Sequence, residues 1–456
     1  MTLRERFIGD REFYKRTANI AVPLALQNML MSCMSIVDTL MVSWIGMVSA
    51  VGTAAQMDVL SGTISYGIIG GIGMFAAQFF GAGDEKNLKR CTGLCLTLVL
   101  ANALIWFSLA AFFARPFLAF YIHDEQVIEN GVKYLGIMKF SFLCSAVSFC
   151  LSSMYRSTHQ PRTALIISTI SGIANIILNW LLIYGIGPFP EMGVQGAALG
   201  TLLASMLSCI ILITHANMTK QIFIGTPGEM FSFNKDFALP ILARSYPLII
   251  NETIFSVGQT LFVKAFGELG KEQMDAYYVG KQIFEVMTTV IYGYGNAVQI
   301  LLGTCLGKGN IQQAKKECDY HLGLGFMIAC FIVTVLCLLA GKMVSLFALT
   351  DPVTEHLAVL IVYVFALKAS LRLFNFMIFC ILRSGGDVQY IQFLDAGIEW
   401  IVGLPSAFIL VYVFGLQNIA LVLLITQIEQ LVRFILGIRR VKSYKWANDL
   451  TQLVTE

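Results

Sequence analysis

Long uncharged runs of apolar residues recur through the whole chain. A helix needs about 20 residues to cross the hydrocarbon core of a bilayer. Runs of that length occupy residues 17–37, 91–113, 163–190, 322–341 and 401–428, and the last contains a turn, so it holds parts of two helices. Adding the apolar segments that carry one or two charges predicts twelve transmembrane helices, which begin near residues 18, 50, 91, 129, 163, 193, 242, 273, 319, 354, 388 and 416.

The composition agrees with an all-α polytopic membrane protein. Only 13% of the 456 residues are charged, whereas a soluble domain carries about 25%. The net charge of +3 gives no indication of nucleic-acid binding. The eleven cysteines form no CxxC pair and predict neither a disulfide framework nor a metal site. We expect no metal and no cofactor.

The basic residues predict how the chain is oriented in the membrane. Most of the 31 Lys and Arg residues fall in alternate loops, on the same side as the N-terminus. By the positive-inside rule this side is the cytoplasm, so both termini are expected there. The first apolar run is too long for the apolar region of a signal peptide, which predicts an uncleaved first helix. The expected location is the cytoplasmic (inner) membrane.

The two halves of the sequence resemble one another. Pro23 is followed by Gly46 at the same spacing as Pro247 is followed by Gly270. Further motifs repeat in the same order, which indicates six helices repeated in parallel. We therefore expect two pseudo-symmetric six-helix lobes around a central cavity, a common transporter plan with its site near the membrane midplane. The expected ranges are 1–216 and 237–456 for the lobes and 217–236 for a cytoplasmic linker.

Asp38 is the clearest candidate for a functional charge. It interrupts an otherwise uncharged stretch from residue 17 to residue 57, and a charge inside a membrane helix is costly. A carboxylate there can bind Na⁺ with neighbouring oxygens, or take up a proton when it is desolvated. The alternative is an Asp at the water interface that caps the loop.

Two asparagines lie one turn apart in the fifth predicted helix. Asn175 and Asn179 therefore share one helix face. Their amide oxygens are suitable ligands for Na⁺. Hydrogen bonding between helices, which is common for asparagine in membranes, explains them equally well.

The second half carries its own intramembrane charges, Glu252, Arg372, Asp395 and Glu399. At 1.5 Å per residue from the helix ends, Glu252, Arg372 and Glu399 reach a similar depth near the midplane. An arginine between two carboxylates forms a charge-compensated cluster. Such a cluster either switches during transport or is a static network of ion pairs.

Two further pairs of polar residues fall in near-equivalent positions of the repeat. Gln56 corresponds to Gln282, and Asp58 corresponds to Glu285. These four residues are candidates for contact with a substrate in the cavity. For Glu285, a local pair with Lys281 one turn earlier is a sufficient explanation.

Short motifs in both halves carry a family resemblance. They are PL at 23–24, VDT at 37–39, AQFFGAG at 77–83, YRS at 155–157, NIILN at 175–179, MGVQGAA at 192–198, NE at 251–252 after Pro247, LGKG at 306–309 after Gly303, RSGGD at 383–387, and Asp395 with Trp400 and Pro405. In this order and spacing they resemble the multidrug and toxic compound extrusion (MATE) family along nearly the whole chain.

The resemblance implies two six-helix lobes around a V-shaped cavity and antiport of organic, often cationic, compounds against a cation. It implies that Asp38 is the coupling carboxylate, with Asn175 and Asn179 beside it. Glu252 matches the C-lobe acid of the branch typified by NorM, but Arg372 stands where that branch has a second acid. We therefore expect coupling to depend chiefly on Asp38, with Glu252 paired structurally or in contact with the substrate.

The expected function is export of small amphipathic or cationic organic compounds in exchange for Na⁺ or H⁺, by a monomer whose other partner is the bilayer. A flippase for a lipid-linked saccharide or cell-wall precursor is the alternative. Such a cavity would be expected to hold several basic residues to meet phosphate, whereas Lys368 and Arg372 stand here beside several acids. An enzyme is not expected, because the sequence contains no cluster of metal-chelating acids such as DDxxD.

Overall fold

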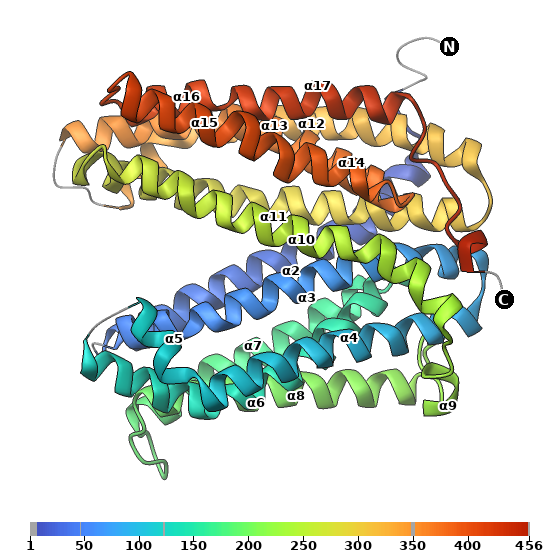
Figure 1. Cartoon of the computed structure of the whole chain (residues 1–456), viewed down its shortest axis with the longest axis horizontal. Helices are drawn as coiled ribbons and strands as arrows, with labels where there is room; N and C mark the ends of the chain where they lie inside the picture. Colours follow the sequence, from blue (N-terminus) through green and yellow to red (C-terminus); the bar gives the residue numbers. More distant parts are fainter. Residues whose placement is uncertain (1–6, 46, 122–123, 348–351, 455–456) are drawn as a thin grey trace. The chain divides into compact units, whose positions relative to one another are not determined.

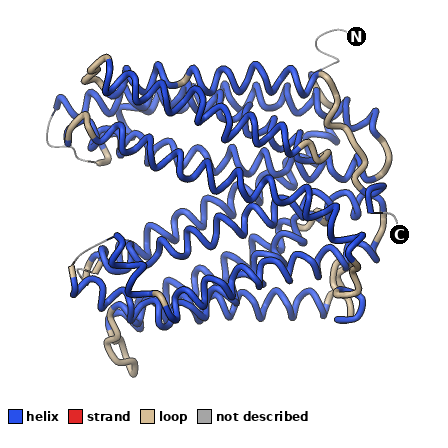
Figure 2. Tube along the Cα trace, in the orientation of Figure 1, coloured by secondary structure: helices blue, strands red, loops and turns tan. Residues whose placement is uncertain are grey.

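The computed structural model describes residues 7–45, 47–121, 124–347 and 352–454. Every regular element in these residues is a helix, and the tube view of them contains no strand (Figure 2). The all-α fold expected from the sequence is confirmed.

The first half of the described chain forms six long helices and two short ones (Figure 1). The long helices are α2 (Arg11–Ser43), α3 (Val48–Ala82), α4 (Glu85–Phe112), α6 (Glu125–Ser157), α7 (Pro161–Tyr184) and α8 (Val194–Met218). The short ones are α5 (Ala114–Tyr121) and α9 (Pro227–Met230). Aspartates begin two of the long helices: the side chain of Asp84 accepts from the Asn87 N–H, and that of Asp124 from the Val127 N–H.

The second half begins with four long helices, which are α10 (Lys235–Gly267), α11 (Lys271–Gly307), α12 (Ile311–Ser345) and α13 (Pro352–Ser384). The next span alternates between α-helix and π-helix, through α14 (Val388–Gln392), η1 (Phe393–Gly397), η2 (Glu399–Gly403), α15 (Leu404–Phe408) and η3 (Ile409–Val413). The last span consists of α16 (Ile419–Thr426) and α17 (Ile428–Lys442), and the short 3₁₀-helix η4 (Thr451–Val454) follows.

Helices occur at all twelve positions where the sequence predicts a span. Ten helical segments of the described chain are long and apolar enough to cross a membrane. The other two positions are those of α10 and α11, with 33 and 37 residues. Several helices begin earlier than expected: α12 starts at Ile311 and not near residue 319, because its first turns are polar and hydropathy detects only the apolar part.

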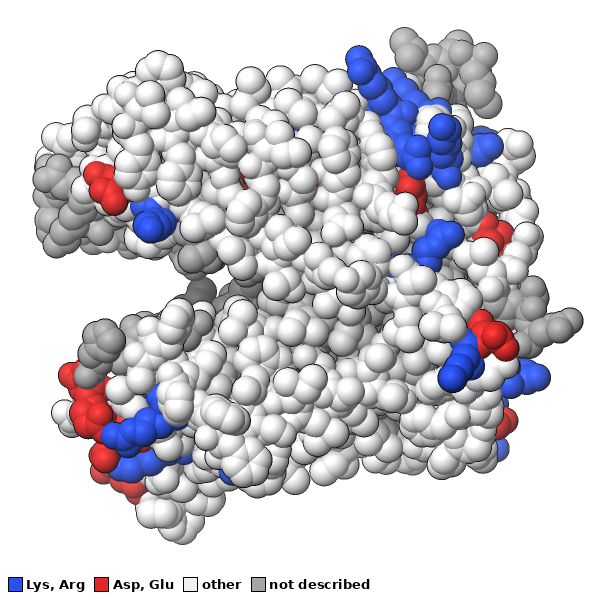
Figure 3. Space-filling view, viewed as in Figure 1, with Lys and Arg blue, Asp and Glu red and all other residues white. Residues whose placement is uncertain are grey.

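The charged side chains on the face shown in Figure 3 are distributed as expected for helices that cross a membrane. They lie toward the ends of the helices, and uncharged side chains cover the middle of the helices. This distribution is the one that a bilayer requires, because exposed charges are tolerated only at the level of the lipid headgroups.

The chain divides into two compact units whose boundaries fall inside helices. One unit comprises Met1–Leu26 and Ile250–Leu453, and the other comprises Gln27–Ile249 with the last three residues. Thus α2 and α10 each contribute their first part to one unit and their second part to the other. The lobes expected at 1–216 and 237–456 differ from these units by this exchange of the first parts of two helices; as functional divisions, those lobes stay a prediction.

Glycines make room for the exchanged parts of α2 and α10. A Cβ atom on Gly67 of α3 would lie 2.8 Å from the Cα atom of Ile249 in α10. In the other unit, a Cβ atom on Gly293 of α11 would lie 2.6 Å from the Cα atom of Ala25 in α2. The internal repeat aligns Ala25 with Ile249 and Gly67 with Gly293, so the same close approach of two backbones occurs once in each unit.

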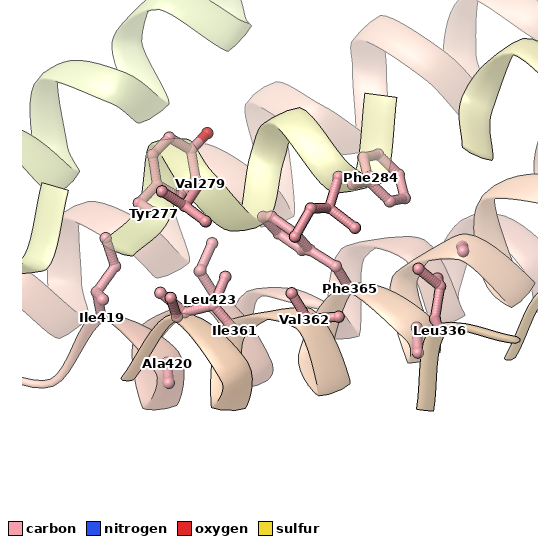
Figure 4. Packing of buried hydrophobic residues seen from close by; sticks show 14 of the residues in the cluster. Tyr277, Val279, Phe284, Leu336, Ile361, Val362, Phe365, Ile419, Ala420 and Leu423 are labelled. Atoms are coloured by element: carbon pink, nitrogen blue, oxygen red, sulfur yellow. The ribbon is translucent and has the colours of Figure 1, made fainter. Parts of the chain in front are cut away.

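The unit that contains the second half has a large apolar core. Figure 4 shows part of this core, and the side chains labelled there come from α11, α12, α13 and α16. The rings of Phe284 and Phe365 lie 5.2 Å apart, between α11 and α13. Gly280 lets these two helices approach, because a Cβ atom there would touch Ile361. This packing fixes α13, which carries several of the predicted charges.

The segment 217–236, which the sequence predicts to be a linker, contains a capping box at the start of α9. The Thr226 N–H donates to Glu229 Oε2 at 2.7 Å, and the Glu229 N–H donates to Thr226 Oγ1. Lys89 Nζ lies 3.1 Å from Glu229 Oε1. The Thr226 N–H, followed by the Lys89 contact, lowers the pKa of Glu229 from its usual value.

Candidate functional site

The structure brings together Asp38, Asn175 and Asn179, the first predicted group. Asn179 Nδ2 donates to Asp38 Oδ1 at 2.9 Å. In the orientation that satisfies the Asn175 amide, its nitrogen lies 3.0 Å from Asp38 Oδ1 and 3.2 Å from Oδ2. The three side chains therefore form one group between α2 and α7.

Close packing of helices positions this group. A Cβ atom on Gly200 of α8 would lie 3.1 Å from the backbone nitrogen of Asn179, so the glycine lets α8 lie directly against α7. Two contacts tie α2 to α7 on either side of Asp38. Gln27 Nε2 donates to Ser168 Oγ at 2.8 Å, and Tyr184 Oη donates to the Met41 carbonyl at 2.7 Å.

The two asparagines act as donors to Asp38. Their N–H groups stabilise an ionised carboxylate, since charge-assisted hydrogen bonds are among the strong ones. The carbonyl oxygen of Asn179 is buried and accepts no hydrogen bond from the residues that the structure describes. In this conformation Asn175 and Asn179 form hydrogen bonds between helices, which is one of the two explanations that their sequence positions allow. Coordination of Na⁺ by their amide oxygens would require the amide groups to rotate.

Asp38 lines two cavities. A cavity of about 280 Å³ is lined by Asp38, Asn175 and Thr201 together with several serines of α6, α7 and α8. A cavity of about 360 Å³ is lined by Asp38, Asn179, Asp58 and a set of methionines. Met31, Met34, Asp38 and Thr201 are common to the two linings, so the carboxylate is accessible to small ions or polar groups from either cavity.

The repeat-related candidates fall in different environments. Asp58 lines the second cavity with Asp38. Gln56 is exposed and donates to the Gly52 carbonyl at 3.5 Å. Glu285 lies 3.7 Å from Lys281 on the surface of α11, which is the local pair expected from their spacing. Gln282 is exposed.

The acids of the second half have partners other than those expected. Glu252 lies 3.4 Å from Arg383, at the end of α13. Arg372 lies instead over the ring of Phe255, and its Nη2 atom donates to Tyr292 Oη at 3.3 Å. Arg372 is therefore not the arginine that lies between two carboxylates.

Arg433 of α17 is that arginine, and it is fully buried. Its Nη1 atom lies 2.8 Å from Asp395 Oδ1, and its Nη2 atom lies 2.5 Å from Glu429 Oε1. Arg433 and Glu429 were not among the residues predicted from the sequence. The rule that identified Asp38, a charge inside a membrane helix, applies to both of them, because they lie well inside the last predicted span.

Asparagine and glutamine side chains of α10 hold the π-helical segment. Asn251 Nδ2 donates to Asp395 Oδ2 at 2.9 Å, and the Ala396 N–H donates to Asn251 Oδ1 at 3.2 Å. Gln259 Nε2 donates to Glu399 Oε1 at 2.5 Å. Asp395 and Glu399 both lie in π-turns, which are often found at functional sites.

The sequence matches the family model MatE over residues 23–181 and again over residues 247–409. The two matches begin at the prolines that the internal repeat aligns. The chain is 24% identical to the probable multidrug resistance protein YoeA of Bacillus subtilis over 395 residues, which is 85% of each protein. It is 23% identical to the probable multidrug resistance protein NorM of Thermotoga maritima, over 89% of this chain and 87% of that protein.

Solved structures share the fold. A crystal structure of MATE in the bent conformation superposes with a TM-score of 0.85 at 17% identity, over the full length of each chain. An outward-facing multidrug resistance MATE family transporter of the MOP superfamily gives a TM-score of 0.83 at 17% identity, over 97% of this chain and 98% of the other. At this level of identity the comparison concerns the fold alone.

Proposed function

Since the chain belongs to the MatE family of multidrug and toxic compound extrusion transporters, we propose that it exports small amphipathic or cationic organic compounds in exchange for Na⁺ or H⁺, by alternating access. The observation that carries this proposal is the position of Asp38. It is a membrane carboxylate that borders two cavities and is held by two amides on a neighbouring helix.

The contacts of Asp38 suggest how ion binding changes the protein. While the carboxylate is ionised, two N–H donors of α7 hold it, and hydrogen bonds to a charged group contribute about 1.5–3 kcal/mol each. Once a proton or Na⁺ neutralises the carboxylate, those donors lose their charged acceptor. The contact between α2 and α7 then weakens, so occupancy of Asp38 controls how firmly the two helices are held together.

The second half supports a chief role for Asp38. Glu252, the acid expected from the NorM branch, is paired with Arg383. Arg372 occupies the place of the second acid, and its positive charge disfavours a bound cation there. Glu252 is therefore assigned a structural role in this proposal.

The expected setting follows from the charges. The protein is proposed to act as a monomer in the cytoplasmic (inner) membrane, with both termini in the cytoplasm, on the side that carries most Lys and Arg residues. The relatives are multidrug resistance proteins and do not favour the flippase alternative.

Efflux from proteoliposomes tests the proposal, with a fluorescent lipophilic cation as the probe and Na⁺ and pH gradients imposed separately. We expect efflux under at least one gradient, and loss of the gradient-driven part in Asp38→Asn. Glu125→Gln is the matched control, because Glu125 pairs with Arg115 on the exposed surface, and it is expected to keep wild-type efflux. Efflux at the wild-type rate in Asp38→Asn, or equal efflux without any gradient, would contradict the proposal.

A further inference from the structure

Among the described residues, Glu399 differs from the other buried acids of the second half in having no cation beside it. Glu317 has Arg16 at 2.6 Å, Asp395 has Arg433 at 2.8 Å, and Glu429 has Arg433 at 2.5 Å. The half-buried Glu252 has Arg383 at 3.4 Å. In the part of the chain that the structure describes, no Lys, Arg or His nitrogen lies within ion-pair distance of Glu399. Its side chain is nevertheless completely buried.

The hydrogen bonds of Glu399 are also incomplete for a charged group. Oε1 accepts one bond, from Gln259 Nε2 at 2.5 Å. Oε2 is buried and has no hydrogen-bond partner among the described residues. An ionised carboxylate with one neutral donor and no cation is expensive in a low-dielectric interior. The neutral acid is the form that these surroundings favour.

The surrounding backbone fits closely around the Glu399 side chain. A Cβ atom on Gly258 of α10 would lie 2.8 Å from the Glu399 carboxyl carbon and 3.0 Å from both of its oxygens. Only a glycine lets α10 lie this close to the acid. An alkali cation needs several oxygen ligands, and this contact leaves little space for one.

We propose that Glu399 is a second ion-binding site of the transporter and that its ligand is a proton. In the present conformation the acid is protonated and Gln259 donates to its carbonyl-like oxygen. Release breaks the O–H bond, the proton passes to water, and the carboxylate keeps the electron pair. This inference rests on the proposed antiport, and it names the ion for the second half.

The charged groups around Glu399 act in opposite directions. The positive charge of Arg433 favours the carboxylate, whereas the negative charges of Glu429 and Asp395 disfavour it. Arg433 is paired with these two acids, and among the described residues its buried Nε and Nη2 atoms have no hydrogen-bond acceptor. Withdrawal of α10 removes the Gln259 donor, which by itself favours the neutral acid, but it also uncovers the carboxyl group at Gly258. Water that enters there solvates the carboxylate, and the Arg433 charge adds to its stabilisation. Movement of α10 against the π-helical segment is thus coupled to proton release.

Infrared spectroscopy of the purified full-length protein tests the protonation directly, without requiring transport. The carbonyl stretch of a protonated buried carboxylic acid is expected in wild type near neutral pH. It should vanish in Glu399→Gln, which keeps an oxygen for Gln259, and persist in the control Glu285→Gln. If Glu399→Gln keeps the whole band, or if Na⁺ abolishes the band at constant pH, the proposal is overturned.

Counting the protons released on substrate binding tests whether Glu399 takes part in transport. Addition of the lipophilic cation to detergent-solubilised protein in weak buffer should release protons, and Glu399→Gln should release about one fewer per chain than the surface control Glu125→Gln. Release that is unchanged in Glu399→Gln would refute the role in coupling. If wild type fails to export the cation under any gradient while the infrared band depends on Glu399, the proposed function fails and the proton site stands.

Discussion

Replacement of Arg433 by methionine should destabilise the unit that contains the second half. The guanidinium lies 2.8 Å from Asp395 and 2.5 Å from Glu429, and it is fully buried. Asp395 would keep the Asn251 donor at 2.9 Å, and Glu429 would keep Gln430 at 3.3 Å. Neither neutral donor replaces a cation.

The decrease in the free energy of unfolding follows from the contacts that are lost and the charges that stay buried. One charge-assisted hydrogen bond, from Arg433 to Asp395, disappears at a cost of about 1.5–3 kcal/mol, and the ion pair with Glu429 is lost with it. Independently, removal of one partner of a buried ion pair costs about 3–5 kcal/mol, because the other charge stays buried without compensation. We expect Arg433→Met to lower the free energy of unfolding by about 3–5 kcal/mol. Lys281→Met removes an exposed ion pair with an Nζ–Oε1 distance of 3.7 Å, and it should lower the free energy of unfolding by less than about 1 kcal/mol.

Thermal unfolding of the purified variants in detergent measures this difference. The decisive comparison is the triple variant Arg433→Met, Asp395→Asn, Glu429→Gln, which removes the uncompensated charges together with the arginine. Burial of neutral groups in place of an ion-pair network is often tolerated, so the triple variant should unfold at a higher temperature than Arg433→Met. Equal unfolding temperatures for these two variants would refute the electrostatic argument and leave lost packing as the cause.

Two further changes test other parts of the structure. Gly71→Ala should destabilise the protein by about 1–3 kcal/mol, because its Cβ atom would lie 2.6 Å from the Ser245 Cα atom; Gly73→Ala, whose Cβ atom would meet nothing nearer than 3.8 Å, is the control in the same thermal assay. The lowered pKa of Glu229 means that its carboxylate stabilises the linker above the unfolded-state pKa, and that this contribution is lost as the pH falls through the folded-state pKa. Glu229→Gln should therefore be cleaved faster than wild type by limited proteolysis in the linker at neutral pH, and the two should converge in acid; a difference that persists in acid would show that the charge is not the cause.

Hydropathy predicted the helices because the bilayer leaves few other solutions. A segment of about 20 apolar residues must satisfy its own backbone hydrogen bonds, and a helix does so. The spacing of Asn175 and Asn179 placed them on one helix face, and the family resemblance placed them beside Asp38. The hydrogen bonds between these three side chains agree with that expectation.

The partners of the buried charges were harder to predict. Depth along a helix was sufficient to put Glu252, Arg372 and Glu399 at one level, but it gives no information on which way each side chain points around its helix. Arg372 turns toward the rings of Phe255 and Tyr292. The ion pairs are made instead by Arg383 and Arg433. Rotation about the helix axis depends on packing between spans that are far apart in sequence.

The π-turns were likewise outside the reach of a pattern analysis. Residues 388–413 are apolar enough to cross a membrane, and a regular α-helix would satisfy the same hydropathy. The widened turns release backbone groups from the helix, such as the Ala396 N–H, which donates a hydrogen bond to Asn251 Oδ1. This arrangement requires a polar residue on a different helix, and no local sequence pattern indicates it.

The division of α2 and α10 between the two compact units constrains how the protein is made. The unit comprising Gln27–Ile249 lacks its share of α10 until synthesis has passed residue 249. The other unit combines the segment up to Leu26 with residues from Ile250 onward, so residues 27–249 are synthesised between its two parts. Neither half of the chain therefore contains every helix segment of its compact unit, and a break between residues 217 and 236 would separate each fragment from part of its unit.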